Sequence, residues 1–318
     1  MIFPANIPVL SADDIAKYAK DINVLETMEQ TFAALANDLV VQPSQTLTLF
    51  PENRGDFITY LGALAHHNVF GAKLSPYIPT NGAPIITAWT MLMSMTTGQP
   101  LLLCDSGKLT QERTAGVTAL AIDKLAPKTS QILAVIGSGS LAKAHIEKVL
   151  PLRDWQSITI YSPSLTKNTE RQNDFLAIDS RIAISQSAAE CVKQADVVML
   201  CTSSGTPVMS LNDLAKPALI TSISTNVAKA HEIAPSALHL MDVYCDYKQT
   251  TPNSAGEMVL ASQDERWPVE AIKGDLADLC SGNASLPVYD KPVFFRSIGL
   301  GIEDIAIAYA VYQQLAKN

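Results

Sequence analysis

One segment near the middle of the chain limits the possible folds more than any other. The apolar run QILAVI leads directly into a glycine-containing turn and then into a helical stretch. The turn fits G-x-G-x-x-A, in which the glycines permit a tight turn and a close approach to a pyrophosphate, while the alanine keeps the helix near the strand. Backbone amides at the start of the helix can then face the anion. The pattern predicts a dinucleotide-binding loop made of Gly137, Ser138, Gly139, Ser140, Leu141 and Ala142.

The surrounding sequence alternates between strands and helices. Apolar, β-rich runs occur at ILAVIG, SITIYS, IAIS, DVVMLCTS and ALITSIS. Helical stretches at 141–150, 165–177 and 187–194 separate them. Nearly continuous apolar strands alternating with helices are typical of a parallel sheet covered on both faces. We therefore expect an α/β fold with a Rossmann-type, doubly wound parallel sheet in residues 121–299.

The first third of the chain has a different, α+β pattern. Residues 11–39 have apolar positions at spacings of three and four, which predicts one or two amphipathic helices after Ser11. Short strand-like runs follow from Thr46 to about Ala65, and again in GAKLSPYI and APIITAWTMLMSM. Helices are predicted at 109–126 and over the final stretch GIEDIAIAYAVYQQLAKN.

Composition excludes several classes of protein. The 318 residues are 47% hydrophobic and 17% charged, and they contain no apolar run long enough for a transmembrane helix. The net charge of −8, with no block of Lys or Arg, disfavours nucleic acid and anionic membranes as partners. The N-terminus lacks the features of a signal peptide, so we expect a cytoplasmic protein. Five scattered cysteines without a C-x-x-C pair predict reduced thiols and no metal site.

The end of the second predicted Rossmann strand bears on the choice of cofactor. An acid that binds the adenosine ribose of NAD should stand there, but SITIYS continues as Pro-Ser without a carboxylate. Ser162, Ser164 and Lys167 could instead hold a 2′-phosphate, so NADP(H) is favoured and NAD(H) stays possible. Thr202, after the run DVVMLC, is included among the expected cofactor contacts.

Four separated motifs occur in one order that resembles the ornithine cyclodeaminase/mu-crystallin family. They are Lys73 in G-x-K, Arg113 and Thr114 in L-T-x-x-R-T-A, the G-x-G-x-x-A loop, and S-I-G-L-G-I-E-D before the last helix. The resemblance extends from about Gln42 to the C-terminus. It implies a homodimer whose substrate-binding and dimerisation domain comprises 1–120 with 300–318, and a substrate held between this domain and the Rossmann domain.

The resemblance also implies roles for individual residues. Lys73 and Arg113 would hold the carboxylate of a small amino-acid or imino-acid substrate, because a guanidinium binds a carboxylate through two hydrogen bonds and an ammonium adds a point charge. Gln45 stands where cyclodeaminases of the family commonly have an Arg, and Asn226 stands where they have an Asp, six residues before Glu232. The expected catalytic residues are Lys73, Arg113 and Asn226. The expected substrate-binding residues are Gln45, Lys73, Arg113 and Thr114.

An amide at 226 cannot act as a base or balance a departing ammonium, which argues against ornithine cyclodeamination. The favoured activity is therefore the NAD(P)H-dependent reduction of a cyclic imino acid. Δ1-Pyrroline-2-carboxylate to L-proline comes first, followed by Δ1-piperideine-2-carboxylate to L-pipecolate. Alternatives are an ornithine cyclodeaminase, an alanine-type amino-acid dehydrogenase, and a crystallin-like binding protein without catalysis.

Two minor features have simpler explanations. Glu303 and Asp304 suit the N-terminal dipole of the last helix, although a second role stays open. His66 and His67 have no third metal ligand nearby in sequence and are interpreted as packing residues.

Overall fold

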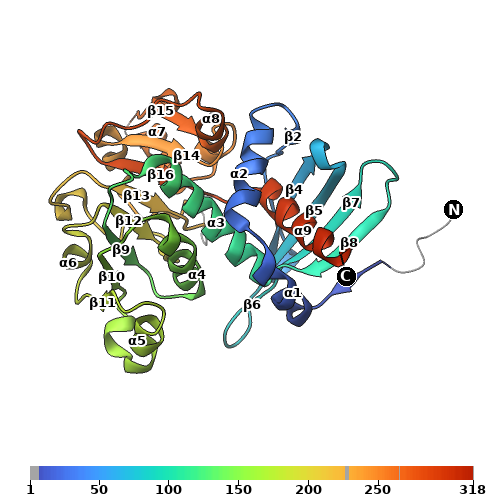
Figure 1. Ribbon diagram of the computed structural model, residues 1–318, viewed down its shortest axis with the longest axis horizontal. Helices are drawn as coiled ribbons and strands as arrows, with labels where there is room; N and C mark the ends of the chain where they lie inside the picture. Colours follow the sequence, from blue (N-terminus) through green and yellow to red (C-terminus); the bar gives the residue numbers. More distant parts are fainter. Residues whose placement is uncertain (1–6, 226–228, 265, 318) are drawn as a thin grey trace. The chain divides into compact units, whose positions relative to one another are not determined.

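The computed structural model describes residues 7–225, 229–264 and 266–317 (Figure 1). These residues form two compact units. The first contains described residues 7–113 and 299–317, and the second contains the described part of 114–298. Helix α3 (Gly107–Leu125) contributes residues to both units. The domain bounds expected from the sequence, 1–120 with 300–318 and 121–299, stay a prediction.

The first unit is built on a mostly antiparallel sheet. Its strand order is β1-β8-β7-β5-β4-β2, with β3 on β4 and β6 on β5, and only the pair β1–β8 is parallel among the described pairs. The strands are β1 (Val9–Leu10), β2 (Val40–Val41), β3 (Thr46–Leu49), β4 (Asp56–Leu64), β5 (Val69–Ile78), β6 (Ile85–Ile86), β7 (Trp89–Ser94) and β8 (Pro100–Asp105).

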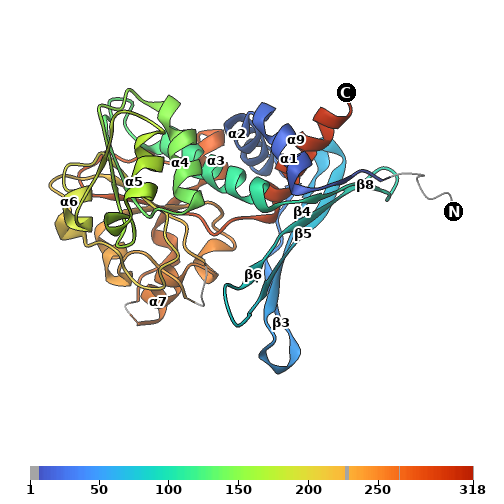
Figure 2. The ribbon, with the colours of Figure 1, turned by 90° about the horizontal axis from the view of Figure 1, so that it is seen from below.

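Three helices cover one face of this sheet, as Figures 1 and 2 show. They are α1 (Ala12–Tyr18), α2 (Val24–Leu35) and α9 (Gly301–Leu315). Helix α1 begins directly after Ser11, as the sequence analysis expected, and a capping box between Ser11 and Asp14 starts it. Helix α9 packs on β4, β5 and β7. It can come this close because Gly62 faces it: a Cβ at Gly62 would lie 2.9 Å from the Ile302 nitrogen.

The second unit contains a parallel sheet, which confirms the predicted fold class. In its described residues the strand order is β11-β10-β9-β12-β13-β16-β14-β15, and every pair is parallel. The strands are β9 (Ile132–Ile136), β10 (Ser157–Tyr161), β11 (Ile182–Ile184), β12 (Val197–Leu200), β13 (Leu219–Ser222), β14 (Asp242–Cys245), β15 (Ile272–Asp275) and β16 (Val293–Arg296). The order reverses between β9 and β12, and ligands of such sheets bind at the carboxyl ends beside this point.

The other helices of the second unit are α4 (Ser140–Val149), α5 (Thr169–Leu176), α6 (Ala188–Val192), α7 (Gly256–Asp264) and α8 (Leu276–Ser281). The helix predicted at 165–177 is divided, because a 3-10 turn at Leu165–Lys167 ends at Asn168, whose side chain caps α5. All five cysteines are free, and four of them are buried. Within the described ranges, no helix is long and apolar enough to cross a membrane.

Candidate active site and dinucleotide loop

Lys73 lies inside the first unit, on strand β5, with only 1% of its surface exposed. Its Nζ donates to Oδ1 of Asp304 at 2.9 Å and to the Thr110 hydroxyl at 3.4 Å. It also lies 4.1 Å from the centre of the Tyr60 ring. Burial lowers the pKa of Lys73 to about 8, and Asp304 opposes that shift. At neutral pH the buried ammonium therefore stays mostly charged.

Arg113 brings a second buried cation to the same carboxylate. It lies on α3, and its Nε donates to Oδ1 of Asp304 at 3.0 Å. Its Nη1 donates to Oε2 of Glu303 at 2.7 Å. Lys73, Arg113, Glu303 and Asp304 are all buried, and we call these four residues the charge cluster. The structure thus brings together the two cations that the sequence singled out.

Glu303 and Asp304 have a larger role than the sequence indicated. They do stand in the first turn of α9, where acids suit the helix dipole. Their side chains, however, are 0% and 2% exposed and pair with the two cations. A signal was present in the sequence, because two adjacent acids in an otherwise apolar helix need partners once that helix is buried.

The other predicted site residues of this group are Gln45, Thr114 and Asn226. Gln45 is half-buried and its Oε1 accepts no hydrogen bond within the part of the chain that the structure describes. Its neighbour Gln42 instead accepts a bond from the Ile302 nitrogen at 3.0 Å. Thr114 follows Arg113 on α3 and is half-buried. Asn226 lies outside the described residues.

The glycine loop has the geometry that a dinucleotide requires. Gly137 has a φ of +126°, and a Cβ there would lie 2.2 Å from the Cys201 carbonyl oxygen. Gly139 has the opposite surroundings, since a Cβ there would meet no atom within 4 Å. Ser140 begins α4, and Ala142 is fully buried against the sheet. The loop therefore leaves open space in front of the amides of a helix N-terminus, which suits a pyrophosphate.

The residues predicted to hold a 2′-phosphate lie beside this loop. The Ser162 hydroxyl is 2.7 Å from the Ser138 hydroxyl and 3.2 Å from that of Ser164. Lys167 is exposed and makes no hydrogen bond or ion pair among the described residues. Arg171, which the sequence analysis did not single out, donates to both Ser138 and Ser164.

Thr202 is held by a buried carboxylate. Its nitrogen and its hydroxyl donate to Oε1 of Glu232 at 2.8 and 2.7 Å. The other oxygen of Glu232 accepts from the Ser222 hydroxyl and from the nitrogens of Ile223 and Ser224. Glu232 therefore links, through hydrogen bonds, the end of β13 and the segments that follow β12 and β13, at the carboxyl edge of the sheet.

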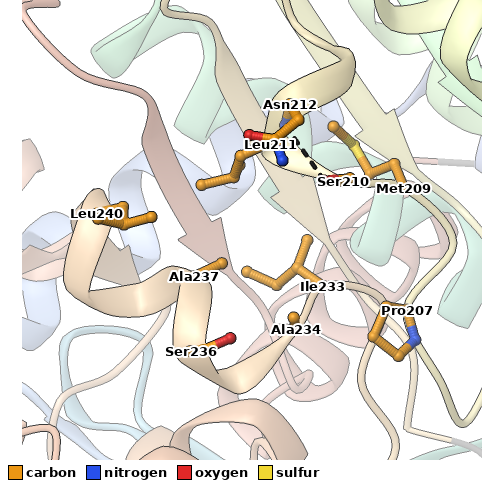
Figure 3. A pocket seen from close by; sticks show the side chains of 10 residues that line it. All are labelled: Pro207, Met209, Ser210, Leu211, Asn212, Ile233, Ala234, Ser236, Ala237 and Leu240. Atoms are coloured by element: carbon orange, nitrogen blue, oxygen red, sulfur yellow. Dashed lines mark hydrogen bonds between the residues drawn. The ribbon is translucent and has the colours of Figure 1, made fainter.

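A separate pocket of about 430 Å³ in the second unit contains none of the predicted site residues (Figure 3). It is lined by Pro207, Met209, Ser210, Leu211, Asn212, Ile233, Ala234, Ser236, Ala237 and Leu240. None of these side chains is titratable, so the pocket offers no acid or base. Across the described chain, no group of three or more His, Cys, Asp or Glu is arranged to hold a metal ion.

A parallel sheet with a glycine loop of this kind binds a dinucleotide cofactor. The chain is an NAD(P)H-dependent oxidoreductase. It belongs to the ornithine cyclodeaminase/mu-crystallin family, since the model of that family matches residues 8–318. The resemblance drawn from the four sequence motifs is thereby confirmed.

Two curated relatives differ in the activity that their names state. The chain is 52% identical to the NAD(P)H-dependent anabolic L-arginine dehydrogenase DauB of Pseudomonas aeruginosa, over 92% of each chain. It is 26% identical to a Δ(1)-pyrroline-2-carboxylate reductase of Colwellia psychrerythraea, over 97% of this chain and 99% of the relative.

Solved structures agree on the fold. The Δ(1)-pyrroline-2-carboxylate reductase of Thermococcus litoralis, in complex with NADH and L-proline, superposes with a TM-score of 0.88 at 23% identity, over 98% of both chains. An archaeal alanine dehydrogenase dimer with bound NAD gives a TM-score of 0.86 at 23% identity, over 98% of this chain and 97% of the other.

Proposed function

We propose that this enzyme uses NAD(P)H to reduce the C=N bond of an open-chain 2-imino acid with a basic side chain, and that L-arginine is the product. The observation that carries the proposal is the 52% identity to an anabolic L-arginine dehydrogenase over 92% of both chains. Relatives named as pyrroline-2-carboxylate reductases are much more distant, at 22–26% identity. An imino acid of this kind forms from the corresponding 2-oxo acid and ammonia.

The charges of the first unit favour a substrate that carries a positive charge besides its carboxylate. The charge cluster contains two cations and two carboxylates, so its formal charges cancel. A substrate carboxylate added to a buried neutral cluster introduces an uncompensated negative charge. A protonated imine balances that charge. The cluster therefore favours a substrate whose carboxylate is balanced by its own protonated imine over a purely anionic one, and this holds for both candidate substrates below.

In this proposal Lys73 and Arg113 bind the substrate carboxylate. Asp304 holds both cations in place, and Glu303 fixes the outer nitrogen of the Arg113 fork. The nicotinamide cofactor supplies a hydride when it is bound. Hydride addition to the carbon of a protonated imine leaves a neutral amine, which takes one proton from solvent. No carboxylate base is needed for this direction, which is compatible with an amide at position 226.

The reduction of Δ1-pyrroline-2-carboxylate to L-proline, with a role in proline metabolism, is the second candidate. It is supported by the Colwellia relative, whose similarity covers 97% of this chain. The same carboxylate-binding cations would serve both substrates. The two candidates differ in what the rest of the site must accept: a long guanidinium-bearing chain or a closed five-membered ring.

The deciding experiment measures NADPH and NADH oxidation by the purified enzyme with three substrates. These are the 2-oxo acid of arginine with ammonia, Δ1-pyrroline-2-carboxylate, and pyruvate with ammonia. We expect kcat/KM for the first to exceed the others by about tenfold or more, because a basic side chain adds binding that the others lack. Faster reduction of pyrroline-2-carboxylate would favour the second candidate. Turnover of none of the three, with cofactor binding intact, would refute both.

We further propose that the protein is a homodimer formed through the first unit. The sheet face opposite the helices carries large apolar side chains that are 38–46% exposed. They are Leu61 on β4, Phe70 and Leu74 on β5, and Trp89 and Met91 on β7. The strand register places Leu74 opposite Trp89, so the side chains form a continuous patch. Exposed apolar patches of this kind mark interfaces, and a second copy offers a self-complementary surface.

A further inference from the structure

Arg171 occupies an unusual position beside the dinucleotide loop. Its Nη2 donates to the Ser138 hydroxyl at 3.0 Å and also to the Ser138 carbonyl oxygen. Its Nη1 donates to the Ser164 hydroxyl at 3.3 Å. The Ser162 hydroxyl lies within 3.2 Å of both serine hydroxyls and completes the group. The guanidinium therefore bonds to two of three neighbouring hydroxyls, and all three follow the ends of β9 and β10.

The local structure fixes each part of this group. Arg171 is in the first turn of α5, and its backbone nitrogen donates to the capping side chain of Asn168 at 3.0 Å. The Ser162 hydroxyl accepts from the Leu165 nitrogen at 3.1 Å. Ser138 and Ser162 are each 7% exposed, so their rotamers are restricted by packing. The site is thus arranged before any ligand binds, which lowers the entropy cost of binding.

Among the described residues, no carboxylate pairs with Arg171. Its bonds within the described residues all go to serine oxygens. Four other arginines of the chain pair with acids, namely Arg113, Arg153, Arg181 and Arg296. A guanidinium that bonds only to neutral serine oxygens can accept an anionic ligand without losing an existing ion pair. A phosphate fits this arrangement, because its oxygens accept from the guanidinium and from the hydroxyls together.

The position of the group in the sheet identifies the anion. Strand β10 neighbours β9, which leads into the glycine loop, and the adenosine ribose of a dinucleotide lies at the end of that neighbouring strand. Residues 161–164 contain no acid to bind a free ribose 2′-hydroxyl. We propose that Arg171, with Ser162 and Ser164, forms a subsite for the 2′-phosphate of NADP(H) and that Arg171 makes the enzyme select NADP(H) over NAD(H).

This assignment differs from the one that the sequence suggested. The sequence indicated Lys167 as the cation, but Lys167 is exposed and bonds to none of the three serines. Arg171 is four residues further along and reaches back to the loop from the next helix. The inference rests on dinucleotide binding at the glycine loop and is independent of which imine is reduced.

The test measures nucleotide binding to the enzyme without an imine substrate. Isothermal titration calorimetry gives the Kd of NADPH, NADH, adenosine 2′,5′-bisphosphate and 5′-AMP for the wild type and for Arg171→Ala. We expect Arg171→Ala to weaken NADPH and the bisphosphate by about tenfold or more, the usual effect of losing one charge-assisted contact. NADH and 5′-AMP should stay within about twofold, since neither carries a 2′-phosphate.

Three further variants separate the proposal from simpler explanations. Arg171→Lys should retain part of the NADPH affinity, because it keeps the charge and loses the planar fork. Lys167→Ala and Arg181→Ala each remove one positive charge from the same unit and should leave the ratio of the NADPH and NADH Kd values unchanged. Arg181 pairs with Asp179 and bonds to none of the three serines. Equal loss of NADPH and NADH affinity in Arg171→Ala would mean that Arg171 only supports the loop, and would overturn the proposal. An unchanged ratio, or a larger effect in Lys167→Ala, would also overturn it.

Discussion

At the scale of single residues, Asp304 is the carboxylate that links the two cations of the charge cluster. One of its oxygens accepts from Lys73 and Arg113 at 2.9 and 3.0 Å, so this carboxylate pairs with both cations, and Glu303 is a second partner for Arg113. Buried charges are tolerated only when they are paired. Here Asp304 pairs with Lys73 and Arg113, and each of these ion pairs restricts the position of both side chains. The glycine at 299, with a φ of +77°, makes room for the guanidinium, because a Cβ there would lie 2.3 Å from Nη1 of Arg113.

The titration of Lys73 leads to a prediction about pH. Burial lowers the pKa of Lys73 to about 8, while Asp304 partly opposes the shift. The ammonium is therefore mostly charged at pH 7 and mostly neutral at pH 9. Because the proposed substrate carboxylate needs the charged form, kcat/KM should fall by about tenfold per pH unit above pH 8. The measurement is kcat/KM with the preferred imino substrate from pH 6.5 to 9.5.

The control is Lys73→Arg, because a guanidinium stays charged through this range. Its activity is expected to be lower overall, and its alkaline limb should move to higher pH. The same limb in both proteins would assign the titration to another group and remove Lys73 from this role.

At the scale of elements, the approach of α9 to the sheet determines whether the cluster can form. Glu303 and Asp304 come from α9, whereas Lys73 comes from β5 and Arg113 from α3. Two glycines at the crossing leave no room for side chains: a Cβ at Gly301 would lie 2.1 Å from the Leu61 carbonyl oxygen. The carboxylates reach the cations only because the helix lies this close to β4.

Gly301→Ala should therefore reduce both stability and activity. The added methyl group meets backbone atoms that cannot rotate away, so we expect a loss of about 1–3 kcal/mol in the free energy of unfolding. Displacement of α9 should also weaken the pairing of Asp304 with both cations and lower kcat/KM. Urea unfolding and steady-state kinetics measure the two effects. Gly82→Ala is the matched control, since a Cβ there meets only the Thr80 hydroxyl at 4.0 Å. Equal stability of the two variants would show that the close approach is not required.

At the scale of the whole molecule, the unit that carries the charge cluster also carries an exposed apolar face. The same sheet buries Tyr60, Lys73 and Leu92 against its helices and exposes Leu74 and Trp89 on the other side. Strand alternation produces both faces from one set of strands. In the proposed dimer, a second copy would cover this exposed face, so the strands that hold Lys73 would be packed on both sides.

Leu74→Glu should convert the proposed dimer to a monomer. The substitution places a carboxylate in the apolar patch of each copy, at a cost of several kcal/mol per ion when it is buried without a partner. Light scattering after size-exclusion chromatography gives the mass. Leu286→Glu, in the second unit at a position 63% exposed, is the control and should leave the mass unchanged. A dimer that persists in Leu74→Glu would move the interface elsewhere, and a wild-type monomer would refute the dimer.

The sequence by itself determined the features that local patterns encode. The turn at Gly137 and Gly139 follows from backbone geometry and from the adjoining apolar strand, and the structure has the strand, turn and helix as expected. Strand β4 occupies the predicted run DFITYLGAL, and its last five residues alternate in burial. Lys73 and Arg113 were found through their motifs.

Tertiary structure decided which distant groups meet. Asp304 is 231 residues from Lys73, and no periodicity links the two positions. Arg171 was missed for the same reason: its contact with Ser138 spans 33 residues and depends on where Asn168 starts α5. Strands β14 to β16 were also missed, since short strands are defined by their neighbours in the sheet as much as by their own residues. Local patterns fix the backbone of each element, whereas the pairing of buried charges depends on contacts that exist only after the elements have packed.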